Sequence, residues 1–261
     1  MERAAILALF DDEQRRNVDI PGMRREATPT VVRYVGEREP HSAVLYSRLD
    51  PARVAAAIAE QVAYFAALGH KFEWKVYEHD MPPDLRERLA AAGFTVEEAE
   101  AVMVLDLEDA PARLLAPVTV PIRRLTDPTA LQDVVTVESE VWGSDCAWLA
   151  AMLSFELQHD PTRMSIFVAD IDGRPAAAAW LRYHPPGQFA SLWGGSTRAP
   201  LRGRGLYTAL LAARAQEARA RGVRFLTVDA GPLSRPILER LGFVRISTAW
   251  ACNWALPGDH R

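Results

Sequence analysis

The segment at residues 189–221 constrains the fold of this chain more than any other. Its apolar start, FASLWGG from Phe189 to Gly195, is typical of a buried strand, and a long Ala/Leu/Arg-rich helix is predicted from Leu206 to Arg221. A polar loop with the sequence RGRG precedes the helix. A strand that turns through a glycine-rich loop into a helix leaves unpaired backbone amides at the helix N-terminus, where the helix dipole adds positive potential. This arrangement predicts an anion site.

The RGRG loop (residues 202–205) by itself supports two interpretations. Gly203 and Gly205 let the backbone approach a phosphate, and Arg202 and Arg204 add positive charge. The same residues also suit a solvated loop before a helix. The loop lacks the Gly-Lys-Ser/Thr of a P-loop and the third glycine of the dinucleotide-binding fingerprint. The rest of the chain must therefore decide between a phosphate cradle and a solvated turn.

Composition narrows the class of protein. With 261 residues, of which 49% are hydrophobic, the chain is long enough for two domains with their own cores. A formal net charge of −4 gives no basic face for nucleic acid. Cys146 and Cys252 are too far apart for a disulfide framework, and the six histidines show no ligand spacing, so no metal is expected. No apolar run is as long as a membrane span, and residues 1–16 indicate an amphipathic helix, so we expect a cytoplasmic protein with no membrane partner.

A proline-rich segment divides the chain. Three prolines between residues 111 and 121 remove backbone donors and disfavour helix. We therefore expect an N-terminal domain at 1–110, a linker and first strand at 111–120, and a C-terminal domain at 118–261. The elements predicted for the second domain are a strand at 120–125, helices at 129–142 and 146–158, a hairpin of 164–170 and 176–183 around an Asp-Gly turn, a strand at 189–196, a helix at 206–221, a strand at 223–228, a helix ending at 237–243 and a strand at 244–252. This order predicts a mixed α/β sheet.

The two parts share an order of elements. A helix, strand, helix and strand follow residue 52, as they follow residue 206. The second helix ends in LRERLAAAGF at 85–94 and in ILERLGF at 237–243, where the glycine allows a left-handed cap and the phenylalanine returns to the core. The repeat indicates a duplication, although this order of elements also arises by chance. The first part has SRLDPARV at 47–54, without glycine and with an aspartate that would repel phosphate, so only the second part is expected to hold the anion.

The C-terminal part resembles the GNAT superfamily of acetyl-CoA-dependent N-acetyltransferases. The family signature, Gln/Arg-x-x-Gly-x-Gly/Ala between the fourth strand and third helix, is matched from Arg202 onward, with Tyr207 in place of the last small residue. The Leu-Gly-Phe helix end is the second matching feature. The resemblance covers roughly 118–261, and the N-terminal part looks like a degenerate copy, as in tandem GNAT proteins. It implies a GNAT-like acyl-CoA N-acyltransferase fold in two related domains.

The resemblance also implies a coenzyme A site. The backbone amides of the RGRG loop and helix start would bind the pyrophosphate, and the end of the preceding strand would offer its backbone to the pantetheine arm. Acetyl-CoA would be the acyl donor and a small-molecule or peptide amine the acceptor. The acceptor's identity, the acyl chain length and the oligomeric state do not follow. The implied cofactor-binding residues are Gly195, Ser196, Thr197, Arg202, Gly203, Arg204, Gly205, Leu206, Tyr207 and Thr208.

The residues for catalysis are less defined. Many GNAT enzymes protonate the leaving thiolate with a tyrosine where this chain has Leu238, which cannot donate a proton. Asp229, at the end of a predicted strand, could accept a proton from an ammonium acceptor, bind the cation, or cap the next turn. Ser234 could donate a hydrogen bond to sulfur or cap the following helix. Glu138 and Glu140 are expected on a solvated helix face, from which either could reach the acceptor pocket.

Three functions remain open from the sequence. Direct acetyl transfer to an amine is favoured, because neither cysteine falls on the expected cleft loops and no Ser-His-Asp set is recognisable. A non-catalytic acyl-CoA-binding or sensing module is the alternative that Leu238 keeps open. A structural interaction protein is the third. Five aromatic residues are predicted on elements that would border the acceptor-binding side of the domain. They either belong to the hydrophobic core or form a pocket that stacks on the acceptor: Trp142, Trp180, Tyr183, Trp193 and Trp250.

Overall fold

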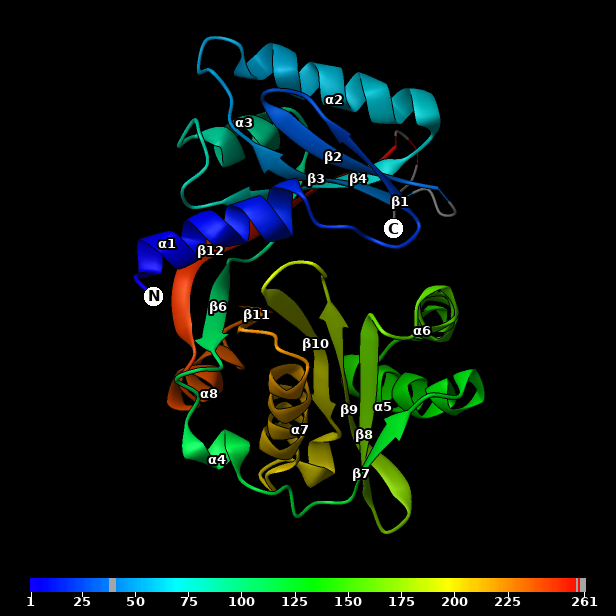
Figure 1. The fold of residues 1–261 in the computed structure, drawn as a ribbon. Helices are drawn as coiled ribbons and strands as arrows, with labels where there is room; N and C mark the ends of the chain where they lie inside the picture. The colour runs from blue at the N-terminus through cyan, green and yellow to red at the C-terminus, as the bar shows by residue number, and fades with distance from the viewer. Residues whose placement is uncertain (38–40, 257, 259–261) are drawn as a thin grey trace. The chain divides into compact units, whose positions relative to one another are not determined.

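The computed structural model describes residues 1–37, 41–256 and 258, which form two compact units (Figure 1). Unit 1 comprises residues up to 103, 229–236 and the described residues from 245 on, and unit 2 comprises 104–228 and 237–244. These units are not the two consecutive segments expected from the sequence, because the last strand, β12 (Val244–Trp254), pairs with an N-terminal strand. The common origin of 1–110 and 118–261 stays a prediction.

Unit 1 is built on a sheet with the strand order β1-β2-β3-β4-β12. Its strands are β1 (Met23–Ala27), β2 (Val31–Gly36), β3 (His41–Ser47), β4 (Lys71–Tyr77) and β12, and β5 (Thr95–Val96) pairs with the far edge of β12. β3 and β4 are parallel and are joined by helix α2 (Val54–Leu68), whereas β12 runs antiparallel to β4. Strands β1 to β3 are not evident from the sequence, because none of these short segments alternates strictly between apolar and polar residues.

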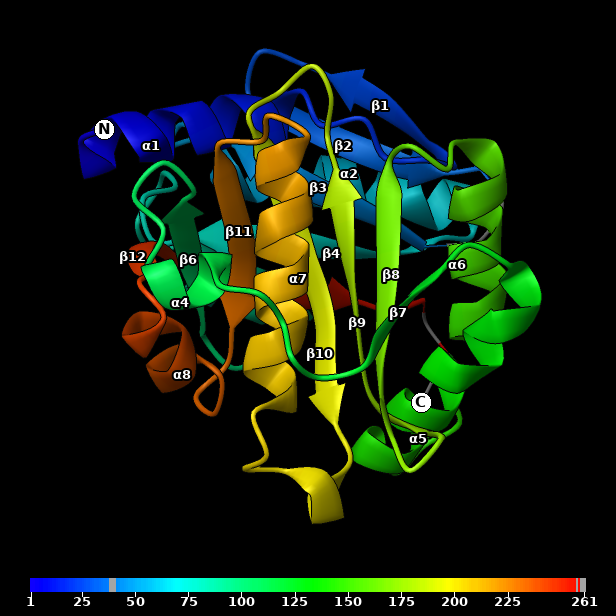
Figure 2. The same cartoon turned by 60° about the horizontal axis from the view of Figure 1, so that its bottom comes forward.

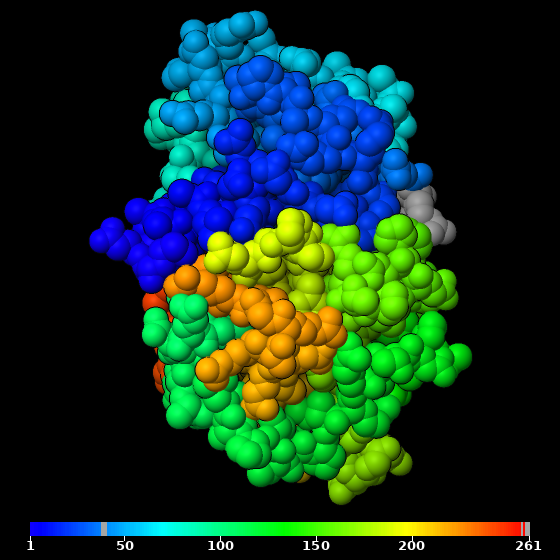
Figure 3. All heavy atoms as spheres, in the orientation of Figure 1, coloured from blue at the N-terminus to red at the C-terminus, as the bar shows by residue number. Residues whose placement is uncertain are grey.

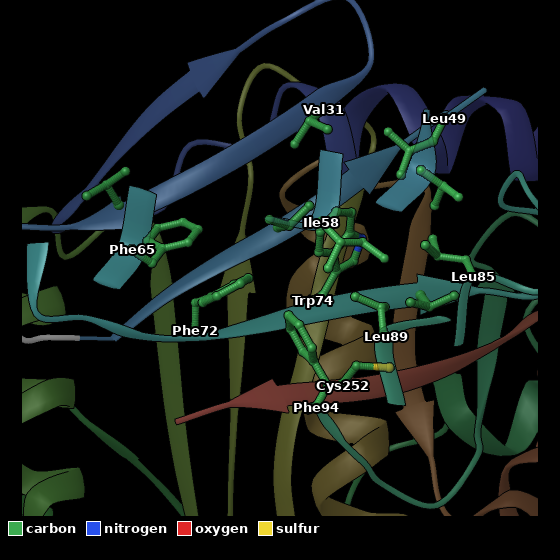
Figure 4. Close-up of a cluster of buried hydrophobic side chains, with 14 residues drawn as sticks. Val31, Leu49, Ile58, Phe65, Phe72, Trp74, Leu85, Leu89, Phe94 and Cys252 are labelled. Atoms are coloured by element: carbon green, nitrogen blue, oxygen red, sulfur yellow. The ribbon is translucent and has the colours of Figure 1, made fainter. Parts of the chain in front are cut away.

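The core of unit 1 lies between this sheet and helices α2 and α3 (Leu85–Ala91) (Figure 4). Phe65 from α2 stacks on Phe72 from β4 with ring centroids 4.3 Å apart. Cys252 from β12 is fully buried in the same cluster, so the C-terminal strand is part of this core. The N-terminal segment forms α1 (Arg3–Phe10), followed by a π-helical turn at Asp11–Arg16, and buries Ile6 and Phe10 as expected for an amphipathic helix.

The strands of unit 2 follow the order β11-β10-β9-β8-β7. Its strands are β7 (Ile122–Leu125), β8 (Met164–Ile171), β9 (Arg174–Tyr183), β10 (Phe189–Thr197) and the first part of β11 (Phe225–Ala230). Neighbouring strands are antiparallel except β10 and β11, which are parallel. The predicted hairpin is confirmed, since Asp172 and Gly173 both have positive φ, as its two-residue turn requires. The structure thus has the mixed α/β sheet predicted from the sequence.

Helices cover both faces of the unit 2 sheet (Figures 1 and 2). α5 (Gln132–Trp142) and α6 (Trp148–His159) pack on the face that carries Val168, Ala178 and Trp180. α7 (Leu206–Ala220) packs on the opposite face, against Phe167, Ala177 and Ala179. This alternation along the strands fixes which side chains of β9 and β10 face which helices. The predicted linker contains the short helix α4 (Ala112–Leu115).

The predicted Leu-Gly-Phe helix ends adopt the same conformation in α3 and in α8 (Arg235–Arg240). Gly93 and Gly242 have φ of 91° and 95°. The next amide donates back into the helix in both places, from Phe94 to Leu89 O at 3.1 Å and from Phe243 to Leu238 O at 3.0 Å. Both phenylalanines are buried, so the left-handed cap returns the chain to the core as predicted.

The chain passes from one unit to the other within strands β6 (Glu100–Asp106) and β12. β6 leaves unit 1 after Met103, and the Leu107 amide donates to Arg224 O within unit 2 at 2.8 Å. β12 makes the reverse crossing, pairing Ala249 with Tyr77 and Trp254 with Phe72 in unit 1. Strand pairing between distant segments is not encoded by local pattern, which explains the difference from the predicted boundary. No helix in the described ranges is long and apolar enough to cross a membrane.

Candidate functional site

The RGRG loop joins β10 to α7 in unit 2, as the sequence predicts. A short 3₁₀ turn at Ala199–Leu201 follows the strand, and Gly203 and Gly205 then take left-handed conformations with φ of 76° and 80°. A Cβ at either glycine would meet no atom within 4 Å, so these glycines serve the backbone conformation and leave open space beside it. Arg202 and Arg204 are exposed, and neither forms an ion pair within the described part of the chain.

The amides at the start of α7 are available to a ligand. The first intrahelical bond runs from the Ala209 amide to Gly205 O at 2.9 Å, so the helix offers no acceptor to the three amides before it. Among the described residues, no backbone or side-chain group accepts from the amides of 203–208. The outer side of α7, orange in Figure 3, reaches the molecular surface. The residues present therefore fit an anionic group at this helix N-terminus.

A β-bulge interrupts β10 directly before the loop. Gly194 pairs with Ala179 and Ser196 with Ala178, which leaves Gly195 as the extra residue. A Cβ on Gly194 would lie 2.5 Å from the Trp180 ring, and one on Gly195 would lie 3.0 Å from the Tyr207 ring. The Tyr207 side chain is therefore accommodated against the strand, where Gly195 leaves room for it. Burial raises the pKa of this phenol.

Arg214 of α7 supports the bulge from the same face as Tyr207. It is 2% exposed, and its guanidinium donates to the carbonyl oxygens of Leu210 at 3.2 Å, Trp193 at 3.3 Å and Trp180 at 3.4 Å. Burial lowers its pKa to about 10. The guanidinium pairs with backbone carbonyls of β9 and β10 where the bulge disturbs their ladder. Arg214 is thus a positioning residue that sequence reasoning missed.

β10 and β11 separate beyond the first part of their contact. They pair only from Phe189 with Phe225 to Ser191 with Thr227, although β10 continues to Thr197. The backbone edge of β10 from Leu192 onward therefore has no pairing from β11 within the described residues. Gly195, Ser196 and Thr197 lie on this free part, where an extended ligand can bind along the strand.

Glu138 of α5 lies at the other face of the bulge. It is 2% exposed, and its Oε2 accepts from Ser196 Oγ and Trp142 Nε1, each at 2.8 Å. Its Oε1 is buried and has no hydrogen-bond partner among the described residues. Burial raises the pKa of this carboxyl, and the two hydrogen bonds oppose the shift. The expectation of a solvated face was wrong for Glu138, because α5 turns this position toward β10, while Glu140 pairs with Arg198 at 2.6 Å.

The two residues predicted for catalysis, Asp229 and Ser234, belong to unit 1, whereas the predicted cofactor residues belong to unit 2. Asp229 forms an ion pair with Lys75 at 3.1 Å and accepts no hydrogen bond from a following amide within the described chain, so the capping alternative finds no support. The Ser234 hydroxyl donates to Gly231 O at 3.3 Å. Leu238, at the position of the family's tyrosine, is fully buried in unit 2.

The aromatic residues expected near the acceptor side divide between core and surface. Trp180 and Tyr183 are buried, whereas Trp142 is 70% exposed and Trp193 is 48% exposed. Trp193 lies opposite Trp180 in the β9–β10 register, on the α5/α6 face, and Arg182 stacks over its ring at 4.7 Å. Trp250 belongs to unit 1, where Arg86 stacks on it at 3.9 Å.

The chain is similar to known proteins in one sequence segment and in its fold. Residues 129–243 match the model of the acetyltransferase (GNAT) family. A GCN5-related N-acetyltransferase from Kribbella flavida is 18% identical, with a TM-score of 0.72 over 99% of this chain and 96% of that one. A functionally unknown conserved protein from Staphylococcus epidermidis is 13% identical, with a TM-score of 0.68 over 95% and 98%. A tandem GNAT protein from the clavulanic acid biosynthesis pathway is 17% identical, with a TM-score of 0.57 over 93% and 86%.

No curated protein sequence matches the chain. At these identities, the similarity to solved structures establishes the fold. The family match covers the segment that holds the RGRG loop, the bulge and the helix end at Phe243. The chain therefore has the fold of the GNAT acetyltransferases, and its residues 129–243 match the model of that family.

Proposed function

We propose that this protein is an acetyl-CoA-dependent N-acetyltransferase that transfers the acetyl group directly to an amine. The observation that carries the proposal is the set of unpartnered amides at 203–208, presented by two left-handed glycines at the N-terminus of a 15-residue helix. These amides would hold the pyrophosphate, with Arg202 and Arg204 adding positive charge. The free edge of β10 at Gly195, Ser196 and Thr197 would hold the pantetheine arm.

In the transfer, the amine nitrogen forms a bond to the acetyl carbon while the bond from that carbon to the CoA sulfur breaks. The acceptor enters as an ammonium and loses two protons in total, one before attack and one after, and the departing thiolate takes up one proton. Acetyl-CoA supplies the activated acyl group. The chain supplies orientation along β10, a fixed bulge held by Arg214, and carboxylates that accept protons.

Two carboxylates are candidates for the proton acceptor. Asp229 remains the candidate from sequence, and one of its carboxylate oxygens lies 3.1 Å from the Lys75 ammonium. Glu138 is the candidate from structure, because it accepts a hydrogen bond from Ser196 and forms no ion pair with any described residue. Leu238 supplies no proton, so water would complete the protonation of the thiolate.

Titration calorimetry with coenzyme A, followed by a thiol-release assay with acetyl-CoA and a panel of amines, tests the proposal. Coenzyme A binding together with amine-dependent thiol release is the expected result. Binding without release on any amine would favour the acyl-CoA-sensing alternative, which the buried Leu238 supports. Absence of binding would overturn both.

A further inference from the structure

Glu138 differs from the other acidic residues that α5 and α6 carry near the unit 2 sheet. Three of these have an arginine partner in the structure: Asp133 with Arg123 at 2.8 Å, Glu140 with Arg198 at 2.6 Å, and Glu156 with Arg182 at 2.6 Å. Glu138 is more deeply buried than any of them and has no basic partner among the described residues. The neighbouring carboxylates are thus paired with arginines, whereas Glu138 has no such partner among the described residues.

One oxygen of the Glu138 carboxylate is held by two donors, and the other is unsatisfied within the described chain. Glu138 Oε2 accepts hydrogen bonds from the Ser196 hydroxyl and the Trp142 indole N–H, which fix the rotation of the carboxylate. Oε1 has no hydrogen-bond donor among the described residues. A buried polar atom without a partner costs on the order of 1–3 kcal/mol, and more when it is charged. A ligand that places a positively charged donor at Oε1 would recover this energy.

Two further buried polar atoms without partners among the described residues lie on adjacent elements of unit 2. They are Thr197 Oγ1, one residue beyond Ser196, and Trp180 Nε1, whose ring packs beside Gly194. Unsatisfied buried groups are few in native proteins and require an explanation, such as a ligand or water that completes them. Trp180 lies on the α5/α6 face, as Glu138 does, whereas Thr197 pairs with Ala177 on the α7 face, so only the indole N–H of Trp180 shares the side of the sheet on which Glu138 lies.

We infer that Glu138 binds the ammonium of the acceptor, and that the acceptor is a primary amine on an apolar body; this inference rests on the proposed function. Ser196 ties the carboxylate to the strand proposed to hold the thioester arm, so an ammonium on Oε1 is held beside that strand. The bound ammonium transfers one proton to Oε1, which leaves the neutral amine as the nucleophile. The raised pKa of Glu138 supports this transfer.

The apolar body is assigned from Trp142. Its indole N–H donates a hydrogen bond to Glu138, yet 70% of the residue is exposed. The buried carboxylate is therefore in direct contact with an aromatic side chain that reaches the surface. Large exposed aromatic side chains favour an apolar or aromatic partner and attract a cation at the ring face. An amine with a charged head and an apolar body satisfies both groups at once.

Calorimetry on the protein saturated with coenzyme A tests the inference without turnover. The probes are tryptamine, tyramine and hexylamine, each with the alcohol that replaces its amine. We expect at least one amine to bind at least tenfold more tightly than its alcohol, and Glu138→Gln to abolish this difference while leaving coenzyme A affinity unchanged. Glu140→Gln is the matched control, since this residue lies on the same helix but is paired with Arg198. The control should keep the amine preference.

The inference is overturned if no amine binds, if amines and alcohols bind alike, or if Glu138→Gln keeps the preference. The amine–alcohol comparison on the unaltered protein remains decisive even if the variant does not fold. If the unaltered protein does not bind coenzyme A, the proposed function is overturned instead. The same amine titrations without coenzyme A would then still decide whether Glu138 binds an ammonium.

Discussion

The ammonium of Lys75 lies 3.1 Å from a carboxylate oxygen of Asp229, within unit 1. A second carboxylate, that of Glu100, lies 3.1 Å from the same nitrogen. Burial alone would lower the pKa of Lys75, but the surrounding carboxylates raise it overall. The pair provides a direct test of whether Asp229 has any role beyond its charge, because Glu100 is an equivalent partner with no predicted role in catalysis.

Asp229→Asn should lower turnover at least tenfold and leave coenzyme A affinity unchanged, if Asp229 accepts the substrate proton. Asp229 keeps 36% of its side chain exposed, so the lost ion pair should cost only about 1 kcal/mol of unfolding free energy. Steady-state kinetics, calorimetry and chemical denaturation measure these three quantities. Glu100→Gln is the control. Equal rates for both variants would reduce Asp229 to a structural partner of Lys75.

Gly205→Val should weaken coenzyme A binding by at least tenfold. Its φ of 80° is disfavoured for a branched side chain, so the backbone amides would leave the positions that the anion requires. Gly222, at the other end of α7, has a φ of 77°, and a Cβ on this residue would likewise meet no atom within 4 Å. Gly222→Val should therefore cost similar stability without changing the affinity. Comparable losses of affinity in both variants would argue against binding at the RGRG loop.

The sequence predicted those parts of the site that depend on local backbone chemistry. The RGRG loop before α7 and the left-handed helix end at Gly242 follow from the residues of their own segments, whereas the left-handed conformations of Gly203 and Gly205 were not predicted. The burial of Glu138 and Arg214 could not be predicted in this way, since it depends on which face of each helix meets β10. The crossing of β12 into unit 1 depends on its pairing with a strand far earlier in the chain, as between Cys252 and Trp74. Long-range pairing of this kind has no local signal.

Gly194→Ala should destabilise the protein by about 2 kcal/mol or more, because overpacking a core and a positive φ both add cost. The new Cβ would lie 2.5 Å from the Trp180 ring, which is buried among core residues of α5 and α6. Combining the change with Trp180→Leu should recover part of the loss, as a double-mutant cycle in denaturant would show. Strictly additive effects of the two changes would contradict a steric origin.

Glu138→Gln should make the ligand-free protein more stable at neutral pH, by about 1 kcal/mol, because the buried charge is removed while the amide oxygen can still accept from Ser196 and Trp142. The sign follows from the raised pKa of Glu138: the native state holds a proton more tightly than the unfolded state, so the charged carboxylate weakens the native protein above its native pKa. As the pH falls through that pKa and then below the unfolded value, the penalty disappears and the two proteins should converge. Denaturation of both proteins across acidic and neutral pH measures the difference. A less stable variant at neutral pH would mean that the carboxylate already has a compensating cation, and would remove the reason for assigning one to the substrate.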